Sequence, residues 1–193
     1  MHRWGGKHQL SSEAYHQVPL AWQAESLLAL HQQLGGWYAL GQTPRLAVHR
    51  SSKHYAVCHH SVWYNLADGI RAGDAICTEL AVRFILAHLI VSYSGYARQR
   101  LLRALKHAEL TASQKQSLSS HFLQQVQTQN RERRFNTALR LWKRLITPAD
   151  LLTLREIVRQ HGKADQHFTA EIQRHFFPEL SLVELDLSQH NEH

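Results

Sequence analysis

The sequence is poor in the two residues that most often interrupt regular structure. Only 4 prolines and 9 glycines occur among 193 residues, which argues against a turn-rich β-sandwich and favours long elements. The composition is 44% hydrophobic and 19% charged, enough apolar material for a core, and this argues against wholesale disorder. A chain of this length suits one folded domain.

Cysteines and long apolar runs are also scarce. The 2 cysteines, Cys58 and Cys77, do not make a disulfide framework and fit a reducing compartment. The first residues are basic, but no apolar run follows them as it would in a secretory signal. The longest apolar stretch, Phe84 to Val91, is too short to span a bilayer. These absences predict a cytoplasmic protein without a membrane span.

Motifs with a known catalytic mechanism are missing. The sequence has no dinucleotide-binding glycine pattern, P-loop, serine-hydrolase elbow or paired-histidine zinc motif. His107 and Glu109 have the spacing of a zinc deaminase pair, but the cysteines that should accompany them are absent. Glu79 and Arg83 are interpreted as a buried ion pair between neighbouring helices, because no second carboxylate or nucleophile is placed beside Glu79. The sequence therefore does not favour an enzyme.

The spacing of apolar residues predicts a mostly α fold. One helix is expected to begin near Ser11 and to end at Gly35–Gly36, and a buried helix should run from Ala75 to Val91 with Asp74 as its N-cap. Residues 37–67 are expected to be irregular, with a small β-hairpin, or a loop and a short helix, near residues 44–60. Further helices are predicted at residues 96–108, 111–125, 131–146, 147–162 and 165–177.

The C-terminal half contains two segments with similar apolar and threonine positions, which resemble an internal repeat with a period of 36 residues. Each copy reads as a helix, a turn at Leu-Thr or Ile-Thr, and a second helix, which suits either stacked αα-hairpins or an antiparallel helical bundle. The predicted organisation is an N-terminal helix and His-rich segment over residues 1–72, a helical core over 73–178 and an extended tail over 179–193, in one folded unit. The matched residues are Leu105, Leu110, Thr111, Leu118 and Phe122 with Leu141, Ile146, Thr147, Leu154 and Val158.

Positive charge is concentrated in one region of the chain. Residues 93–163 hold 14 Lys or Arg and 4 Asp or Glu, a net charge of +10, whereas the whole chain carries +7. A local positive field attracts polyanions, and the arginine fork binds phosphate through two hydrogen bonds. The sequence therefore predicts that DNA or RNA is bound by its phosphate backbone, in a nucleic-acid-binding or ribonucleoprotein accessory protein. The predicted contact residues are Arg98, Arg100, Arg103, Lys106, Arg133, Arg134, Arg140, Lys143 and Arg144.

Two alternatives remain open at this point. Stacked helical hairpins could present a groove to an acidic protein partner. The chain could also be a metal-dependent enzyme, because imidazole and thiolate groups together suit zinc. The sequence does not favour a metal or another cofactor, since it lacks a C-x-x-C pair and the ligands would have to assemble across a loop. The ligands of that alternative would be His54, Cys58, His59 and Cys77.

Overall fold

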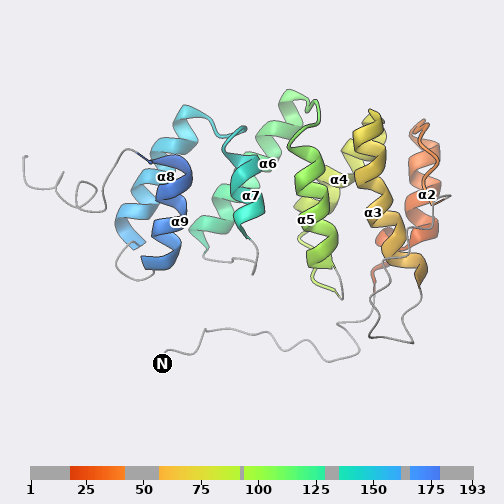
Figure 1. Cartoon of the computed structure of the whole chain (residues 1–193), viewed down its shortest axis with the longest axis horizontal. Helices are drawn as coiled ribbons and strands as arrows, with labels where there is room; N and C mark the ends of the chain where they lie inside the picture. The colour runs from red at the N-terminus through yellow and green to blue at the C-terminus, as the bar shows by residue number, and fades with distance from the viewer. Residues whose placement is uncertain (1–17, 42–56, 92–93, 129–134, 162–165, 179–193) are drawn as a thin grey trace, which may run out of the picture. The chain divides into compact units, whose positions relative to one another are not determined.

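The computed structural model describes residues 18–41, 57–91, 94–128, 135–161 and 166–178 (Figure 1). This part of the chain is all-α, with eight α-helices, one short 3-10 helix and no strand, which confirms the predicted class. No helix within it is long and apolar enough to cross a membrane. The helices are η1 Leu20–Trp22, α2 Ala24–Gln33, α3 Val57–Ala72, α4 Ala75–Leu86, α5 Ser94–Leu105, α6 Ala112–Gln127, α7 Phe135–Trp142, α8 Pro148–His161 and α9 Gln166–Phe176.

The chain divides into two compact units, and the boundary between them along the sequence lies within α5. The first unit is Met1–Leu101 and the second is Leu102–His193. The division predicted from the sequence, between residues 72 and 73, falls at the turn from α3 to α4. In the structure this turn lies inside the first unit, where α3 and α4 pack directly against each other.

In the first unit α2, α3 and α4 pack against one another (Figure 1), and an aromatic cluster joins parts of this unit. Phe84 of α4 contacts Trp22 and Trp63, with 5.2 Å between ring centroids in each pair. Trp63 Nε1 donates a hydrogen bond to the carbonyl oxygen of Trp22 at 2.9 Å. Large aromatic rings bury much apolar surface, and their edge or tilted contacts favour particular orientations of the rings. This cluster therefore joins η1 to α3 and α4.

The structure corrects the prediction for residues 37–67. Val57–Ala72 is one helix of 16 residues, so the hairpin interpretation is wrong for residues 57–60, and the rest of that segment lies outside the described residues. The expected helix from Ser11 is observed only from Ala24, after the 3-10 turn that follows Pro19, and residues before 18 are outside the described part. The α3 side chains that enter the core recur at helical spacing: Val62, Trp63, Leu66, Ala67 and Ile70.

A two-residue turn joins α3 to α4. Gly73 has a φ of +89°, a left-handed conformation that glycine adopts without the strain imposed by a Cβ atom. Asp74 follows at once, and its Oδ1 accepts hydrogen bonds from the backbone N–H of Ile76 at 2.8 Å and of Cys77 at 3.1 Å. The predicted N-cap of α4 is therefore confirmed, because these two N–H groups have no partner within the helix.

The second unit closes four helices into a ring. α6 contacts α7 and α8, and α9 contacts the same two helices (Figure 1). Both predicted helix starts are confirmed: Thr111 and Gln114 form a reciprocal capping box, and Thr147 Oγ1 accepts from the N–H of Asp150 at 3.1 Å. The ring encloses a core that includes Leu118, Phe122, Leu139, Trp142, Leu154 and Ile172.

A buried hydroxyl connects three helices of this ring. Ser119 of α6 accepts a hydrogen bond from Trp142 Nε1 of α7 at 3.0 Å and donates one to Asp150 Oδ2 of α8 at 2.8 Å. Ser119 and Trp142 are both inaccessible to solvent. The indole N–H therefore depends on this hydroxyl, since a buried donor that loses its acceptor is costly.

We predict that Ser119→Ala destabilises the protein by about 1–3 kcal/mol, because the indole N–H of Trp142 loses its acceptor inside the core. The measurement is the free energy of unfolding in urea. Ser120→Ala is the matched control, since Ser120 is the exposed neighbour on the same helix and its loss should change stability by less than about 0.5 kcal/mol. Equal effects of the two substitutions would contradict the prediction.

Candidate functional sites: a buried His, Asp and Cys cluster and a basic surface

The carboxylate of Asp74 is a buried acceptor shared by several segments. Besides the two N–H groups at the start of α4, Asp74 Oδ2 accepts from the backbone N–H of Trp37 at 2.9 Å and of Tyr38 at 2.7 Å. His31 Nε2, from the last turn of α2, lies 3.0 Å from the same oxygen. An ionised carboxylate only accepts hydrogen bonds, so Nε2 is the donor in this contact. Asp74 thus joins α2, the segment after it and the start of α4.

Cys77 completes a compact cluster with His31 and Asp74. Its Sγ lies 3.4 Å from His31 Nε2, and one ligand atom from each residue lies within 4.8 Å of the others. Two glycines close over the cluster: a Cβ atom at Gly36 would overlap the His31 ring, and one at Gly69 would overlap Cys77 Sγ. All three side chains are buried. The cluster is therefore enclosed by backbone as well as by side chains.

The electrostatics of the cluster keep the carboxylate ionised and the free thiol protonated. Burial alone would raise the pKa of Asp74, but hydrogen bonds from the Tyr38 and Cys77 backbone, the His31 ring and the Ile76 backbone hold that pKa below its ordinary value. Burial, assisted by the neighbouring Asp74 charge, raises the pKa of the Cys77 thiol far above its usual range. The free thiol is consequently a poor nucleophile at neutral pH.

This arrangement does not suit nucleophilic catalysis. In a Cys–His–Asp relay the imidazole uses one ring nitrogen for the thiol and the other for the carboxylate. Here the same atom, His31 Nε2, faces both Asp74 and Cys77, and the thiol is inaccessible. The three side chains do bring together nitrogen, oxygen and sulfur donors of the kinds that bind divalent transition metals.

Sequence reasoning placed Cys77 in a different set of metal ligands. In the structure Cys77 contacts His31 and Asp74 instead, and the sequence identified Asp74 only as a helix cap. His54 lies outside the described residues, as do the side chains of Cys58 and His59. The sequence did not predict the contact between His31 and Asp74. These residues are 43 positions apart, so no short motif contains both.

The predicted basic residues of α5 have unequal environments. Arg98 is buried and its Nη2 donates to the carbonyl oxygen of Leu89 at 2.7 Å, which corrects the expectation that it is available at the surface. Burial also lowers its pKa to about 10. Arg100 Nη2 contacts Asp68 Oδ1 at 2.9 Å, and the Arg100 guanidinium lies 5.7 Å from the Tyr64 ring centroid. Arg103 is exposed and Lys106 is half-buried.

The predicted basic residues of α7 and the turn after it lie at the surface. Arg140, Lys143 and Arg144 are exposed, whereas Arg133 and Arg134 lie outside the described residues. Phe135 and Trp142 of α7 are both buried.

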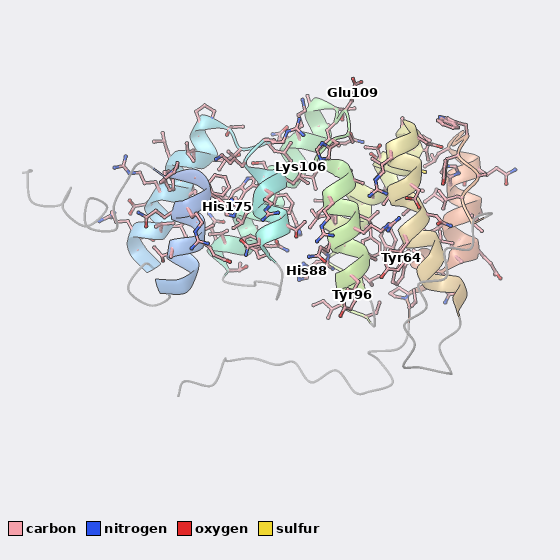
Figure 2. All side chains as sticks on the ribbon, viewed as in Figure 1. Tyr64, His88, Tyr96, Lys106, Glu109 and His175 are labelled. Atoms are coloured by element: carbon pink, nitrogen blue, oxygen red, sulfur yellow. The ribbon has the colours of Figure 1, made fainter. Side chains whose placement is uncertain are left out.

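Polar contacts connect α7 with α9. Asn136 Nδ2 donates to Glu171 Oε1 at 2.6 Å, and Asn136 Oδ1 lies 3.3 Å from His175 Nε2. His175 lies on the side of α9 that faces α7 (Figure 2). These contacts bring the polar face of α7 beside the last turn of α9.

Three cations gather around His175. Its pKa is lowered by burial first and then by the positive charge of Arg140, Lys143 and Arg174, while Glu171 acts in the opposite direction. In the described part of the chain none of these three cations forms an ion pair with a carboxylate. We call Arg140, Lys143, Arg174 and His175 the α7–α9 basic cluster. Sequence reasoning missed Arg174 and His175 because they lie beyond the basic segment.

The pair Glu79 and Arg83 is structural, but not in the way the sequence suggested. Arg83 Nε donates to Glu79 Oε1 at 2.7 Å within α4, and both side chains reach solvent. The pair therefore stabilises one helix at spacing i, i+4 and is not a buried bridge between helices.

Comparisons of the chain with protein-family models, with curated proteins and with solved structures found no match. Function is therefore inferred from the contacts and charges of the described residues alone.

We predict that Asp74→Asn lowers the free energy of unfolding by about 3–6 kcal/mol in chelator-treated protein. The amide nitrogen cannot accept, so two backbone N–H groups lose a charged acceptor, and each such bond contributes about 1.5–3 kcal/mol. Urea unfolding at neutral pH measures the change. Asp68→Asn is the control, because Asp68 pairs with Arg71 and Arg100 nearer the surface and should cost about 1 kcal/mol or less. A smaller loss at Asp74 than at Asp68 would refute the central role of Asp74.

Proposed function

We propose that this protein binds the phosphate backbone of a nucleic acid through the α7–α9 basic cluster. The observation that carries the proposal is that α7 and α9 are joined by the contacts of Asn136 with Glu171 and His175. The exposed cations Arg140, Lys143 and Arg174, on these two helices and the turn after α7, all act on the charge of His175. The carboxylate among them, Glu171, is already hydrogen-bonded to Asn136. Because three cations outnumber this one carboxylate, the surface around His175 has a net positive charge.

The chemistry of the cluster suits phosphate groups. Arginine presents a planar fork of donors that matches two phosphate oxygens, and lysine adds a point charge. Cations held on packed helices need less ordering on binding than cations on separate loops. The net charge of +10 over residues 93–163 would also raise the local concentration of a polyanion and speed its encounter. Each of these effects favours backbone binding.

The proposal concerns the backbone and not base sequence. The chain contains none of the short motifs that place side chains against base edges, so binding should be led by charge and shape. Of the other predicted contact residues, Arg103, Lys106 and Arg144 remain candidates, whereas Arg98 does not, because it is buried. We also propose that the protein has no catalytic activity and acts as an accessory protein that binds nucleic acid.

We predict that the triple variant Arg140→Glu, Lys143→Glu, Arg174→Glu binds single-stranded RNA or DNA more than about 10-fold more weakly than the unaltered protein. The strands should exceed a typical site of about 4–16 nucleotides. Fluorescence anisotropy, measured between about 50 and 200 mM salt, should also show a salt slope smaller by about 2, because each phosphate contact on a single strand contributes about 0.7.

Two controls make this test specific. Arg155→Glu changes the charge of an exposed residue of α8 in the same unit and should alter affinity much less. An acidic peptide of equal charge separates the two kinds of partner, because a phosphate-binding site should prefer the nucleic acid. Equal losses in the triple variant and in Arg155→Glu would contradict the proposal, as would binding that does not depend on salt.

We predict that nucleic acid binding raises the pKa of His175. In the free protein this pKa lies below the ordinary value of 6.5, because burial and three cations disfavour the imidazolium. Bound phosphates offset those cations, so the complex takes up a proton and affinity increases as the pH falls through the pKa of the bound state. The measurement is affinity against pH, compared with His175→Gln. Identical pH dependence in the two proteins would show that phosphate does not approach His175.

A further inference from the structure

The cluster of His31, Asp74 and Cys77 has no part in the proposed nucleic acid binding. It lies in the first unit, and its three side chains are inaccessible or nearly so. Within the described residues these three side chains bring an imidazole nitrogen, a carboxylate oxygen and a thiol sulfur within 4.8 Å of one another. These three atom types are the ones through which proteins bind zinc.

The distances from the His31 nitrogen to the other two atoms are close to those in a zinc tetrahedron. Zinc bonds of about 2.0–2.1 Å to nitrogen, 2.0–2.2 Å to oxygen and 2.3 Å to sulfur place nitrogen about 3.4 Å from oxygen and about 3.6 Å from sulfur. In the structure His31 Nε2 lies 3.0 Å from Asp74 Oδ2 and 3.4 Å from Cys77 Sγ, and all three atoms lie within 4.8 Å of one another. The three atoms are therefore near the positions that ligands of one ion would take.

The charges of the three groups balance a divalent ion. A carboxylate and a thiolate together carry two negative charges and the neutral imidazole carries none, so the loaded site has no net charge, as an enclosed site requires. Binding releases the thiol proton of Cys77 to solvent, because a coordinating thiol is deprotonated by the metal. His31 would coordinate through Nε2 and carry its hydrogen on Nδ1.

The backbone holds the ligands in place before an ion arrives. Four N–H groups orient the Asp74 carboxylate, in the way that outer hydrogen bonds orient carboxylate ligands of metals. Gly36 and Gly69 pass so close to His31 and Cys77 that no side chain fits at either glycine. Coordination therefore costs one hydrogen bond, from His31 to Asp74, and leaves the four backbone contacts intact.

We propose that His31, Asp74 and Cys77 bind one zinc ion, each through one ligand atom. The ion would join the end of α2 to the start of α4. Because the three ligands are enclosed, its role would be to hold these segments together rather than to bind a substrate.

The test is a cobalt titration of the purified full-length chain after removal of metals with a chelator. Co²⁺ replaces zinc and reports its ligands: a sulfur-to-cobalt charge-transfer band indicates thiolate, and intense visible bands indicate tetrahedral geometry. We expect about one ion per chain, with zinc displacing cobalt and raising the melting temperature. If the unaltered protein shows no charge-transfer band, the proposal is overturned whatever the variants do.

Matched variants identify the ligands. Cys77→Ser should abolish the charge-transfer band, and His31→Gln should weaken binding by more than the roughly 10–100-fold that loss of an outer partner costs. Circular dichroism checks that each variant is folded, and His31→Gln keeps the test decisive if Cys77→Ser does not fold. Cys58→Ser and His54→Gln, from the set that the sequence suggested, should bind cobalt normally. Loss of the band in Cys58→Ser with retention in Cys77→Ser or His31→Gln would refute the assignment.

Discussion

The first unit depends on one buried carboxylate. A charged group removed from water is tolerated only when hydrogen bonds replace its hydration, and Asp74 meets this condition with four backbone N–H groups and the His31 ring. These donors come from the end of α2, from Trp37 and Tyr38, and from the first turn of α4. Because a single group serves all of them, a change at any one of these positions disturbs the others.

The two candidate sites differ in kind. The cluster around Asp74 is enclosed and brings nitrogen, oxygen and sulfur atoms together inside the protein core. The α7–α9 basic cluster lies at a surface, and its cations raise the electrostatic potential at His175. The first site is proposed to bind a small ion and the second an extended polyanion. The two proposals are therefore independent, since each rests on residues of a different unit.

The features that the sequence predicted correctly are interactions between residues close together in the chain. Asp74, Thr111 and Thr147 cap helices through N–H groups two or three residues away, so their roles are visible in short windows. The contact between His31 and Asp74 spans 43 residues and is set by the packing of α2 against α3 and α4, which no window contains.

The burial of Arg98 and the helix α3 were not predicted, although the sequence contains a pattern that indicates each of them. Arg98 precedes Leu101 and Leu102 by three and four residues, so it lies on the apolar face of α5 and is buried with them; the assumption that arginines stay at the surface concealed this. The buried residues of α3, among them Trp63 and Leu66, recur at helical spacing. The histidines, serines and aromatic residues of that segment favour helix only weakly, and packing against α4 stabilises it.

The most direct test of this account is amide hydrogen exchange at Trp37 and Tyr38, followed by NMR in the unaltered protein. Both residues lie outside any helix, Trp37 is 65% exposed and Tyr38 is half-buried, so helix formation would protect neither amide and side-chain burial would not protect that of Trp37. If the Asp74 carboxylate holds this segment, both amides should open with a free energy close to that of Ile76 and Cys77 in α4. Exchange of Trp37 and Tyr38 at the rate of an unstructured chain would contradict the account.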